Sequence, residues 1–277
     1  MNFVTLISDI GNADYLIGAV KAQLLQANPD LHIIDITHKI TPFNFPQTSY
    51  ICRGSFKNFP DFTFHLILVN LYEKKPRNLL LTFHKNQYIL CPDNGLLSMI
   101  LEERPDMVMG IPLENHSPKN TLSYARTMAT TINRILKGEP MDQIGLPDFN
   151  YIEKNPLQPL QDHDAIEGQI IFIDNFENVI VNITRHQFET LRKGRKFKII
   201  FKRDEIISTI SESYADVPEG EKLAFFNSAD YMEIAINKGN AAGLFGLKGF
   251  SDRASQSSAL MHNQLMYQTV RILFENE

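Results

Sequence analysis

The first 36 residues alternate between strand-like and helix-like segments, and this alternation limits the possible folds more than any other feature of the sequence. Residues 3–7 and 31–36 are short and mainly apolar, as buried strands are, whereas residues 14–27 carry apolar side chains at a helical period. Asn28 and Pro29 then end the helix. A strand, a helix and a strand in this order predict a βαβ unit, in which the two strands are parallel.

Similar segments continue to about residue 136. Strands are predicted at residues 63–69, 78–83 and 87–90, and helices at residues 94–101 and 125–136. Because βαβ units place helices against parallel strands, we expect residues 1–150 to form an α/β domain with a mostly parallel sheet.

The pattern changes beyond residue 150. Residues 151–166 contain Pro156 and Pro159 among polar residues, which is typical of an interdomain linker. Short β-type runs separated by turns follow at residues 169–173, 179–183, 197–201, 223–226, 231–236 and 269–274, with one amphipathic segment at residues 257–268. This spacing predicts a small all-β, barrel-like domain over residues 167–277.

Composition and charge argue against several classes of function. The formal net charge is −5 and no apolar run reaches transmembrane length, so nothing favours binding to nucleic acid or to a membrane. The one dense basic stretch, residues 192–196, is interpreted as a solvated turn before a strand. Cys52 and Cys91 form no disulfide framework, and the eight histidines have no metal-binding spacing. We therefore expect a cytoplasmic protein without a bound metal.

Several polar residues lie where strands are predicted to end. Asp9 follows the first strand, and in open α/β sheets ligands bind beyond the carboxyl ends of strands. Its carboxylate suits a ribose diol, although an acid at this place is also typical of a turn or a helix N-cap. In the second half, Asn178 and Ser228 suit the edge of a purine and Phe176 suits its face, but each taken alone is more typical of a turn than of a ligand contact.

Five segments, taken in order, give a more specific indication. They are residues 6–14 (LISDIGNAD), 34–43 (IDITHKITPF), 91–97 (CPDNGLL), 174–183 (DNFENVIVNI) and 227–241, which begins with NS and ends with EIAINKGNA. Together they resemble the S-adenosylmethionine hydroxide adenosyltransferase family, to which the fluorinases and chlorinases are related. The resemblance covers nearly the whole chain.

The resemblance implies a fold, an assembly and a reaction. It implies an α/β domain followed by a small β-barrel-like domain, assembled as a homotrimer with the ligand between the first domain of one subunit and the second domain of a neighbour. The implied reaction is attack at C5′ of S-adenosylmethionine with loss of methionine, in which water gives adenosine and a halide gives a 5′-halo-5′-deoxyadenosine. S-adenosylmethionine is the substrate or ligand, and no separate cofactor is implied.

The resemblance also implies a set of binding residues. Asp9 would hold the ribose diol, and Phe43 would form an apolar wall. The adenine and the amino acid end would be held by residues of the second domain, namely Asp174, Phe176, Asn178, Ser228, Asn240 and Ala241.

The chain departs from the family pattern where the reaction would be catalysed. The family loop Val-Asp-Pro-Gly-Val-Gly-Thr-x-Arg corresponds to residues 69–77 (VNLYEKKPR), so Arg77 is kept while Asn70 replaces the aspartate. Tyr124 stands in place of the family's histidine, as a tyrosine does in the halogenases. Asparagine is no base, and an unperturbed tyrosine has a pKa of about 10.

Two main hypotheses follow, and they differ in turnover. The leading hypothesis is slow cleavage of S-adenosylmethionine by water, with Arg77, Asn70 and Tyr124 at the reacting centre. The alternative is a protein that binds S-adenosylmethionine or adenosine without turnover; a halogenase or an unrelated adenosine-handling enzyme has less support. If the chain is a hydrolase, we expect Asn70→Asp with Tyr124→His to raise its activity, because positioned acid–base groups accelerate proton transfer.

Overall fold

The computed structural model describes residues 1–73, 77–113, 120–147, 149–202, 205–247 and 268–275. The chain divides into two units, Met1–Pro156 and Leu157–Glu277, so the boundary falls within the residues predicted as a linker. Residues 160–162 and 165–166, also placed in the linker by the sequence, already belong to strands. No helix in the described ranges is both long enough and apolar enough to cross a membrane.

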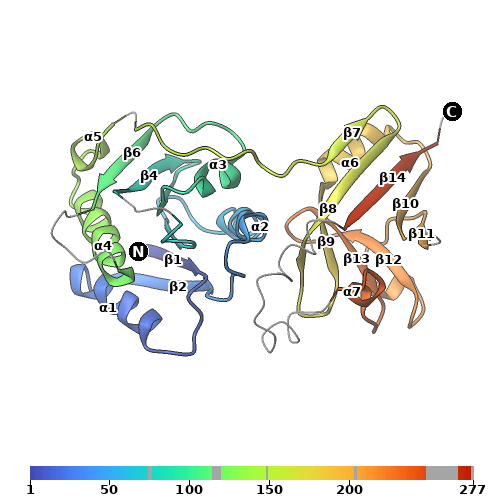
Figure 1. Cartoon of the computed structure of the whole chain (residues 1–277), viewed down its shortest axis with the longest axis horizontal. Coiled ribbons are helices and arrows are strands. Elements are labelled where there is room, and N and C mark those ends of the chain that lie inside the picture. The colour runs from blue at the N-terminus through green and yellow to red at the C-terminus, as the bar shows by residue number, and fades with distance from the viewer. Residues whose placement is uncertain (74–76, 114–119, 148, 203–204, 248–267, 276–277) are drawn as a thin grey trace. The chain divides into compact units, whose positions relative to one another are not determined.

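The first unit contains one six-stranded sheet and the helices that connect its strands (Figure 1). In chain order its elements are β1 (Asn2–Ser8), α1 (Leu16–Ala27), β2 (Leu31–Thr37), α2 (Phe45–Phe56), β3 (Phe64–Leu68), β4 (Asn78–His84), β5 (Gln87–Pro92), α3 (Leu96–Leu101), β6 (Val108–Pro112), α4 (Thr121–Leu136) and α5 (Met141–Ile144). The strand order is β2-β1-β3-β5-β4-β6.

The sheet is mixed, so the α/β domain is as predicted, while the expectation that its sheet is mostly parallel is not confirmed. β1 pairs in parallel with β2 and β3, and β3 with β5, whereas β4 is antiparallel to both β5 and β6. The reversal has a local cause: Lys85 and Asn86 join β4 to β5 with φ values of 47° and 61°, which is typical of a two-residue type I′ hairpin. Such a loop can join only antiparallel neighbours.

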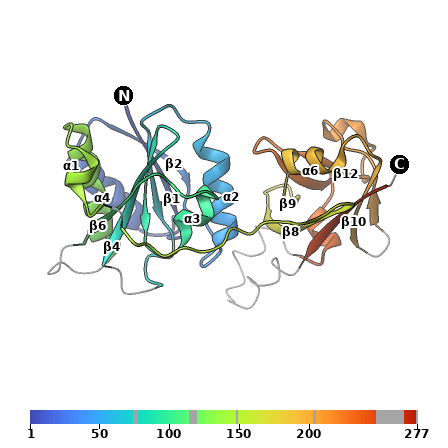
Figure 2. The same ribbon diagram turned by 90° about the horizontal axis from the view of Figure 1, so that it is seen from above.

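Helices cover both faces of this sheet (Figure 2). α1 and α4 pack together over one face, where Val20, Leu24 and Met128 lie in one apolar cluster. α2 and α3 pack together over the other face, in a second cluster that contains Cys52 and Ile100. The arrangement leaves the carboxyl ends of the parallel strands as the edge where connecting loops meet.

The helix α2 was missed in the sequence because its buried side is only partly apolar. Thr48 and Ser49 are buried there beside Cys52, so no apolar period marks the helix. Its start is marked instead by Asn44, whose Oδ1 accepts a hydrogen bond of 3.0 Å from the Gln47 amide. α4 similarly begins earlier than residue 125, because Asn120 and Ser123 form a capping box ahead of Thr121.

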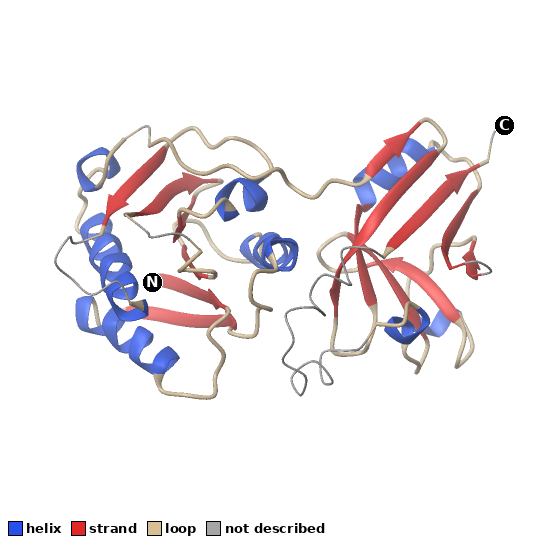
Figure 3. Ribbon diagram, viewed as in Figure 1, coloured by secondary structure: helices blue, strands red, loops and turns tan. Residues whose placement is uncertain are grey.

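The second unit is an antiparallel sheet that nearly closes into a barrel, in agreement with the predicted barrel-like domain (Figure 3). Its elements are β7 (Leu160–Asp162), β8 (Ala165–Ile173), β9 (Val179–Thr184), α6 (Arg185–Arg192), β10 (Phe197–Lys202), β11 (Glu205–Ile207), the 3₁₀ turn η1 (Tyr214–Asp216), β12 (Lys222–Phe226), β13 (Tyr231–Ile236), α7 (Ala241–Leu244) and β14 (Thr269–Phe274). The strand order is β11-β10-β14-β8-β9-β13-β12, with β7 beside β8.

The two ends of this strand order are tied to each other. Lys222 at the start of β12 forms an ion pair with Glu205 at the start of β11. The Ser211 amide donates a hydrogen bond of 2.8 Å to the carbonyl of Ala224 in β12. Residues 257–267 of the amphipathic segment predicted before β14 lie outside the described residues.

Candidate functional site

Three polar residues follow the adjacent parallel strands β1, β3 and β5, and hydrogen bonds connect them. The Asn70 amide nitrogen donates to Asp9 Oδ2 over 2.9 Å. Asn94 Nδ2 donates to the carbonyls of Val69 and Asn70, each over 3.1 Å. The carboxyl edge of the parallel strands, where α/β sheets bind ligands, is therefore organised around Asp9 and Asn70.

Asp9 is a half-buried carboxylate at this edge. Burial raises its pKa, while hydrogen bonds from the backbone of Asn70 and of Asp9 itself act in the opposite direction. The chain turns directly after it at Gly11, which has a φ of 82° and donates its amide to the carbonyl of His38 over 2.8 Å. The turn fixes Asp9 against the loop that follows β2.

The loop after β3 bends at Asn70. Asn70 is buried and has a φ of 52°, a left-handed conformation that asparagine tolerates better than most residues. Its Nδ2 donates to Glu73 Oε2 over 2.7 Å. Glu73 in turn pairs with Lys154, whose Nζ lies 3.0 Å from Oε1 and 3.3 Å from Oε2. The sequence analysis gave no role to Glu73, where the loop departs from the family pattern, or to Lys154, which lies in no recognisable motif.

The two other residues predicted at the reacting centre lie apart from this network. Tyr124 is fully buried in the α1–α4 side of the core, where burial, followed by the neighbouring Tyr72, raises its pKa to about 12. The rings of Tyr124 and Tyr72 meet edge to face at 5.9 Å. Arg77 has an exposed side chain, and its carbonyl accepts from the Leu113 amide. Within the described residues, no hydrogen bond joins Arg77, Asn70 or Tyr124 to one another.

Phe43 lies in the loop between β2 and α2. Its side chain is 72% exposed and its backbone has a φ of 64°. A large apolar side chain held at the surface in a left-handed conformation is uncommon, and it leaves an aromatic face open to a ligand or a partner.

In the second unit, a buried amide lies among three oxygen atoms. Asn178 Nδ2 is 3.1 Å from Asp174 Oδ2, 2.8 Å from Glu233 Oε1 and 2.5 Å from the Tyr214 hydroxyl. The other oxygen of Glu233 accepts from Asn227 Nδ2 over 3.1 Å. Burial raises the pKa of Glu233, and the charge of Asp174 adds to this increase. Tyr214 and Glu233 were not predicted from the sequence.

The predicted residues of the turn between β8 and β9 are brought together by Asp174. Its Oδ1 accepts from the amides of Phe176 and Asn178, over 2.9 and 2.8 Å. The Ala242 amide donates to the carbonyl of Glu177, so the start of α7 lies against this turn. Asn240 caps α7 and Ala241 is buried beside it, whereas Ser228 is exposed in the β12–β13 turn.

A pocket of about 410 Å³ opens beside this turn. It is lined by Phe176, Asn178, Tyr214, Ile236, Asn237, Lys238 and Gly239. Phe176 is 72% exposed, so its ring is available for stacking. An apolar surface with a few placed polar groups in a volume of this size suits a small ligand with an aromatic ring.

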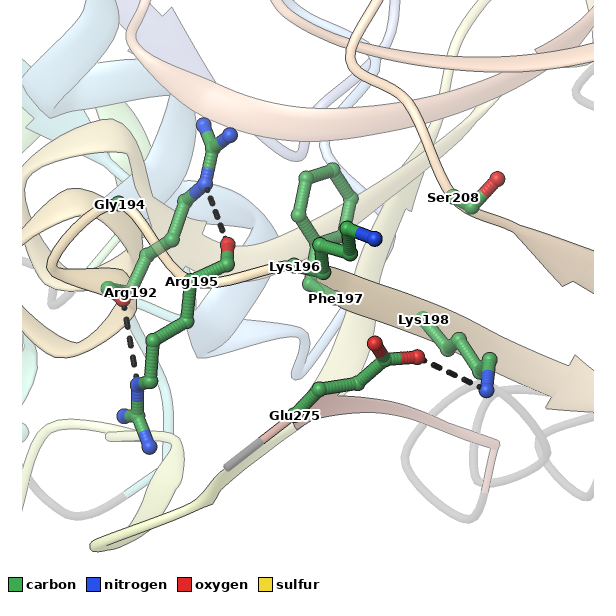
Figure 4. Close-up of a pocket in the computed structure, with 8 residues that line it drawn as sticks. All are labelled: Arg192, Gly194, Arg195, Lys196, Phe197, Lys198, Ser208 and Glu275. Carbon is green, nitrogen blue, oxygen red and sulfur yellow. Dashed lines mark hydrogen bonds and ion pairs between the residues drawn. The ribbon is translucent and has the colours of Figure 1, made fainter. Parts of the chain in front are cut away.

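A second pocket, of about 340 Å³, is formed by the basic stretch after α6 (Figure 4). Three of its cations are bound within the protein: Arg195 pairs with Asp164, Lys198 pairs with Glu275, and Arg192 Nε donates to the carbonyl of Arg195. These contacts support the interpretation of residues 192–196 as a turn before a strand. The part of the chain that the structure describes contains no cluster of three or more histidine, cysteine, aspartate or glutamate residues able to hold a metal ion.

Two family models match the chain. The model of the SAM hydroxide adenosyltransferase N-terminal domain matches residues 4–145, and that of the C-terminal domain of the same family matches residues 168–252. The two matches fall one on each structural unit.

Curated relatives match over most of their own length. An (R)-S-adenosyl-L-methionine hydrolase of Methanocaldococcus jannaschii is 24% identical over 89% of this chain and 93% of the relative. A protein of the same name from Thermus thermophilus is 25% identical over 90% of this chain and 97% of the relative. A fluorinase of Nocardia brasiliensis is 24% identical over 88% of this chain and 93% of the relative.

Two solved structures share the fold. An uncharacterized conserved protein from Thermotoga maritima superimposes with a TM-score of 0.79 at 23% identity, covering 98% of this chain and 99% of its own. A conserved hypothetical protein from Thermus thermophilus gives a TM-score of 0.70 at 20% identity, covering 99% of this chain and all of its own.

Proposed function

The chain belongs to the S-adenosylmethionine hydroxide adenosyltransferase family, since two family models match most of it, and we propose that it binds S-adenosylmethionine and cleaves it with water. The family resemblance of the five sequence segments is thereby confirmed. The observation that carries the proposal is the pocket lined by Phe176 and Asn178, which offers an exposed aromatic face to a purine. Relatives named as hydrolases and fluorinases agree with a ligand of this kind.

We assign binding roles on the same basis. Asp9 accepts hydrogen bonds from the ribose diol, because it is a carboxylate at the carboxyl edge of the sheet. Phe43 and Phe176 supply exposed aromatic surface. The remaining contacts to adenine and to the amino acid end come from Asp174, Asn178, Ser228, Asn240 and Ala241.

The proposed reaction is a displacement at C5′. The oxygen of water bonds to C5′ while the C5′–S bond breaks, its electron pair stays on the sulfur of methionine, and one proton is released. The sulfonium is already a good leaving group, so the protein has mainly to orient the water and to exclude competing solvent. Asn70 would orient the water. Tyr124, with its pKa of about 12, is not a proton acceptor at neutral pH.

Assembly and location are also proposals. We propose a homotrimer in which the first unit of one subunit and the second unit of its neighbour form one composite site, because a ring closes such heterologous interfaces. We further propose a cytoplasmic location, in which the two free cysteines, both buried, stay reduced.

One observation favours a second function, binding without turnover. The two residues that would replace the family's acid and histidine are an amide at position 70 and a buried phenol at position 124, and neither accepts a proton readily. A protein that keeps the pocket but lacks a proton acceptor would sense or sequester S-adenosylmethionine or adenosine.

Product analysis distinguishes these functions. The purified protein is incubated with S-adenosylmethionine, with and without chloride or fluoride, and the nucleosides are separated by chromatography. We expect adenosine in both cases. A 5′-halo product that appears only with halide would assign a halogenase instead. Calorimetric binding without any nucleoside product would assign the binding function, and absence of binding at millimolar ligand would refute both.

A further inference from the structure

Glu73 is a carboxylate near the proposed ribose site. Neither the proposed binding roles nor the proposed reaction involves it. It stands where the family loop quoted above has a valine, and it lies three residues beyond Asn70. Its Oε2 accepts from Asn70 Nδ2 over 2.7 Å, while the Asn70 amide nitrogen donates to Asp9. Asn70 thus bridges two carboxylates, one of which is proposed to hold the ribose. Glu73 is therefore linked through a single residue to the carboxylate proposed to hold the ribose.

The counter-ion of Glu73 is held in a fixed position. The Lys154 ammonium lies 3.9 Å from the centroid of the Phe45 ring, a second contact that stabilises the cation. Ser98 Oγ forms two hydrogen bonds with the main chain of Lys154. It accepts one from the Lys154 amide over 2.8 Å and donates the other to the Lys154 carbonyl over 2.9 Å. The Lys154 side chain crosses Gly95, where a Cβ would come within 2.5 Å of Lys154 Cγ.

Glu73 also remains accessible to water. Its side chain is 33% exposed, so it is neither part of the core nor fully solvated. Two donors, Asn70 and Lys154, approach its two oxygen atoms, and a carboxylate offers about four acceptor positions. Acceptor capacity therefore remains for a water molecule.

We infer that Glu73 accepts the proton of the attacking water, an assignment that rests on the proposed cleavage of S-adenosylmethionine. As the water oxygen bonds to C5′ and the C5′–S electron pair leaves with methionine, the released proton passes to the Glu73 carboxylate and then to solvent. Asn70 and Lys154 hold the carboxylate in position. The acid that position 70 lacks is thus supplied three residues later in the same loop.

Glu73→Gln is the informative variant, because glutamine keeps the size of the side chain and can still accept a hydrogen bond from Asn70. We expect kcat for adenosine formation to fall roughly 10²-fold or more, while KM and the calorimetric affinity for S-adenosylmethionine stay close to those of the wild type. Glu73→Asp, which keeps the carboxylate, should retain part of the activity. The matched control is Glu139→Gln, which removes a carboxylate from another ion pair, with Arg134, in the same unit and should leave turnover unchanged.

The outcomes separate this assignment from the proposed function. Adenosine formation by the wild type and equally by Glu73→Gln would overturn the assignment alone. Loss of S-adenosylmethionine binding together with turnover in Glu73→Gln would also overturn it, because the residue would then serve binding. If the wild type binds S-adenosylmethionine and forms no adenosine, the proposed cleavage and this assignment both fail.

Discussion

Asn70 contacts a carboxylate with each of its two nitrogen atoms. Its main-chain nitrogen donates to Asp9 and its side-chain nitrogen donates to Glu73. The left-handed backbone at this residue, with a φ of 52°, is what allows both contacts from one position. A single residue thus sets the distance between the carboxylate proposed to bind ribose and the carboxylate inferred to accept a proton.

The first prediction concerns Asp9. Asp9→Ala should weaken the binding of S-adenosylmethionine or adenosine by about 1.5–3 kcal/mol, because a charge-assisted contact to the ribose is lost. Isothermal calorimetry measures the change. Asp30→Ala, which removes an exposed carboxylate at the α1–β2 turn, is the control. Equal affinities for the Asp9 variant and the wild type would exclude Asp9 from the site.

The second prediction reverses the expectation that Asn70→Asp with Tyr124→His raises hydrolysis. A carboxylate at position 70 would lie about 2.7 Å from Glu73, where two like charges raise the pKa of one of them. A histidine at position 124 would place an imidazole in the fully buried core. We expect the double variant to unfold at a lower temperature and to form less adenosine than the wild type.

Tyr124→Phe is the control for this pair. The Tyr124 hydroxyl has no hydrogen-bond partner among the described residues, so its removal should change neither stability nor turnover substantially. A large loss of kcat in Tyr124→Phe would show that the Tyr124 hydroxyl takes part in the reaction. A more active double variant would show that Glu73 tolerates a second carboxylate beside it.

At the scale of elements, three segments of the second unit share one polar cluster. The β8–β9 turn contributes Asp174 and Asn178, η1 contributes Tyr214, and β13 contributes Glu233. Asn178 and Glu233 are almost completely buried, so the hydrogen bonds between them replace those that water would make. The pocket wall is therefore fixed by contacts between elements. A substitution in one element should alter the positions of the residues that the others contribute.

The third prediction concerns the pH dependence of this cluster. Glu233→Gln turns one carboxylate oxygen, a hydrogen-bond acceptor, into an amide NH2 donor that faces the NH2 donor of Asn178 or Asn227, which should destabilise the fold by about 1–3 kcal/mol. The folded pKa of Glu233 is raised above its ordinary value of 4.5, so its contribution to stability is complete below that pH and decreases as the pH rises through the folded pKa. The loss of unfolding free energy caused by Glu233→Gln should therefore become smaller as the pH rises.

Urea unfolding of the wild type and of Glu233→Gln at about pH 4.5 and at pH 8 measures this difference. The same pair of experiments with Glu205→Gln, which breaks the ion pair with Lys222 between β11 and β12, is the control. A cost that grows with pH would mean that the Glu233 carboxylate is stabilised, not disfavoured, by its surroundings.

At the scale of the whole molecule, the proposed binding residues are divided between the two units. Asp9 and Phe43 belong to Met1–Pro156, whereas Phe176, Asn178 and the pocket belong to Leu157–Glu277. In a homotrimer with composite sites, each subunit would contribute its first unit to one site and its second unit to another. Cyclic assembly makes all three sites equivalent.

The fourth prediction tests this division by complementation. Light scattering should give three times the monomer mass. Asp9→Ala and Phe176→Ala should each bind and cleave S-adenosylmethionine poorly as homotrimers, since every site lacks one residue. Mixed trimers of the two variants should regain activity, because some interfaces combine an intact Asp9 with an intact Phe176. A monomer mass, or no recovery on mixing, would contradict the composite site.

Local patterns in the sequence determined the order of most strands and helices, the barrel-like second unit and the position of Asp9 at a strand end. These features follow from side-chain period and turn residues, which act over a few neighbouring positions. The hairpin at Lys85 and Asn86 was also locally encoded: the predicted strands at residues 78–83 and 87–90 are separated by too short a gap for a parallel crossover.

Only the tertiary structure decided which polar groups meet. Lys154 reaches Glu73 across 81 residues of sequence, and Glu233 reaches Asn178 across 55. The burial of Tyr124 depends on how α4 packs on the sheet and against α1, which its own neighbours do not specify. Periodicity places a side chain on one face of its element, whereas the charge next to it is set by the packing of elements distant in sequence. For that reason the sequence indicated the edge of the sheet where we propose the site, and only the fold showed that Glu73 and Lys154 lie there.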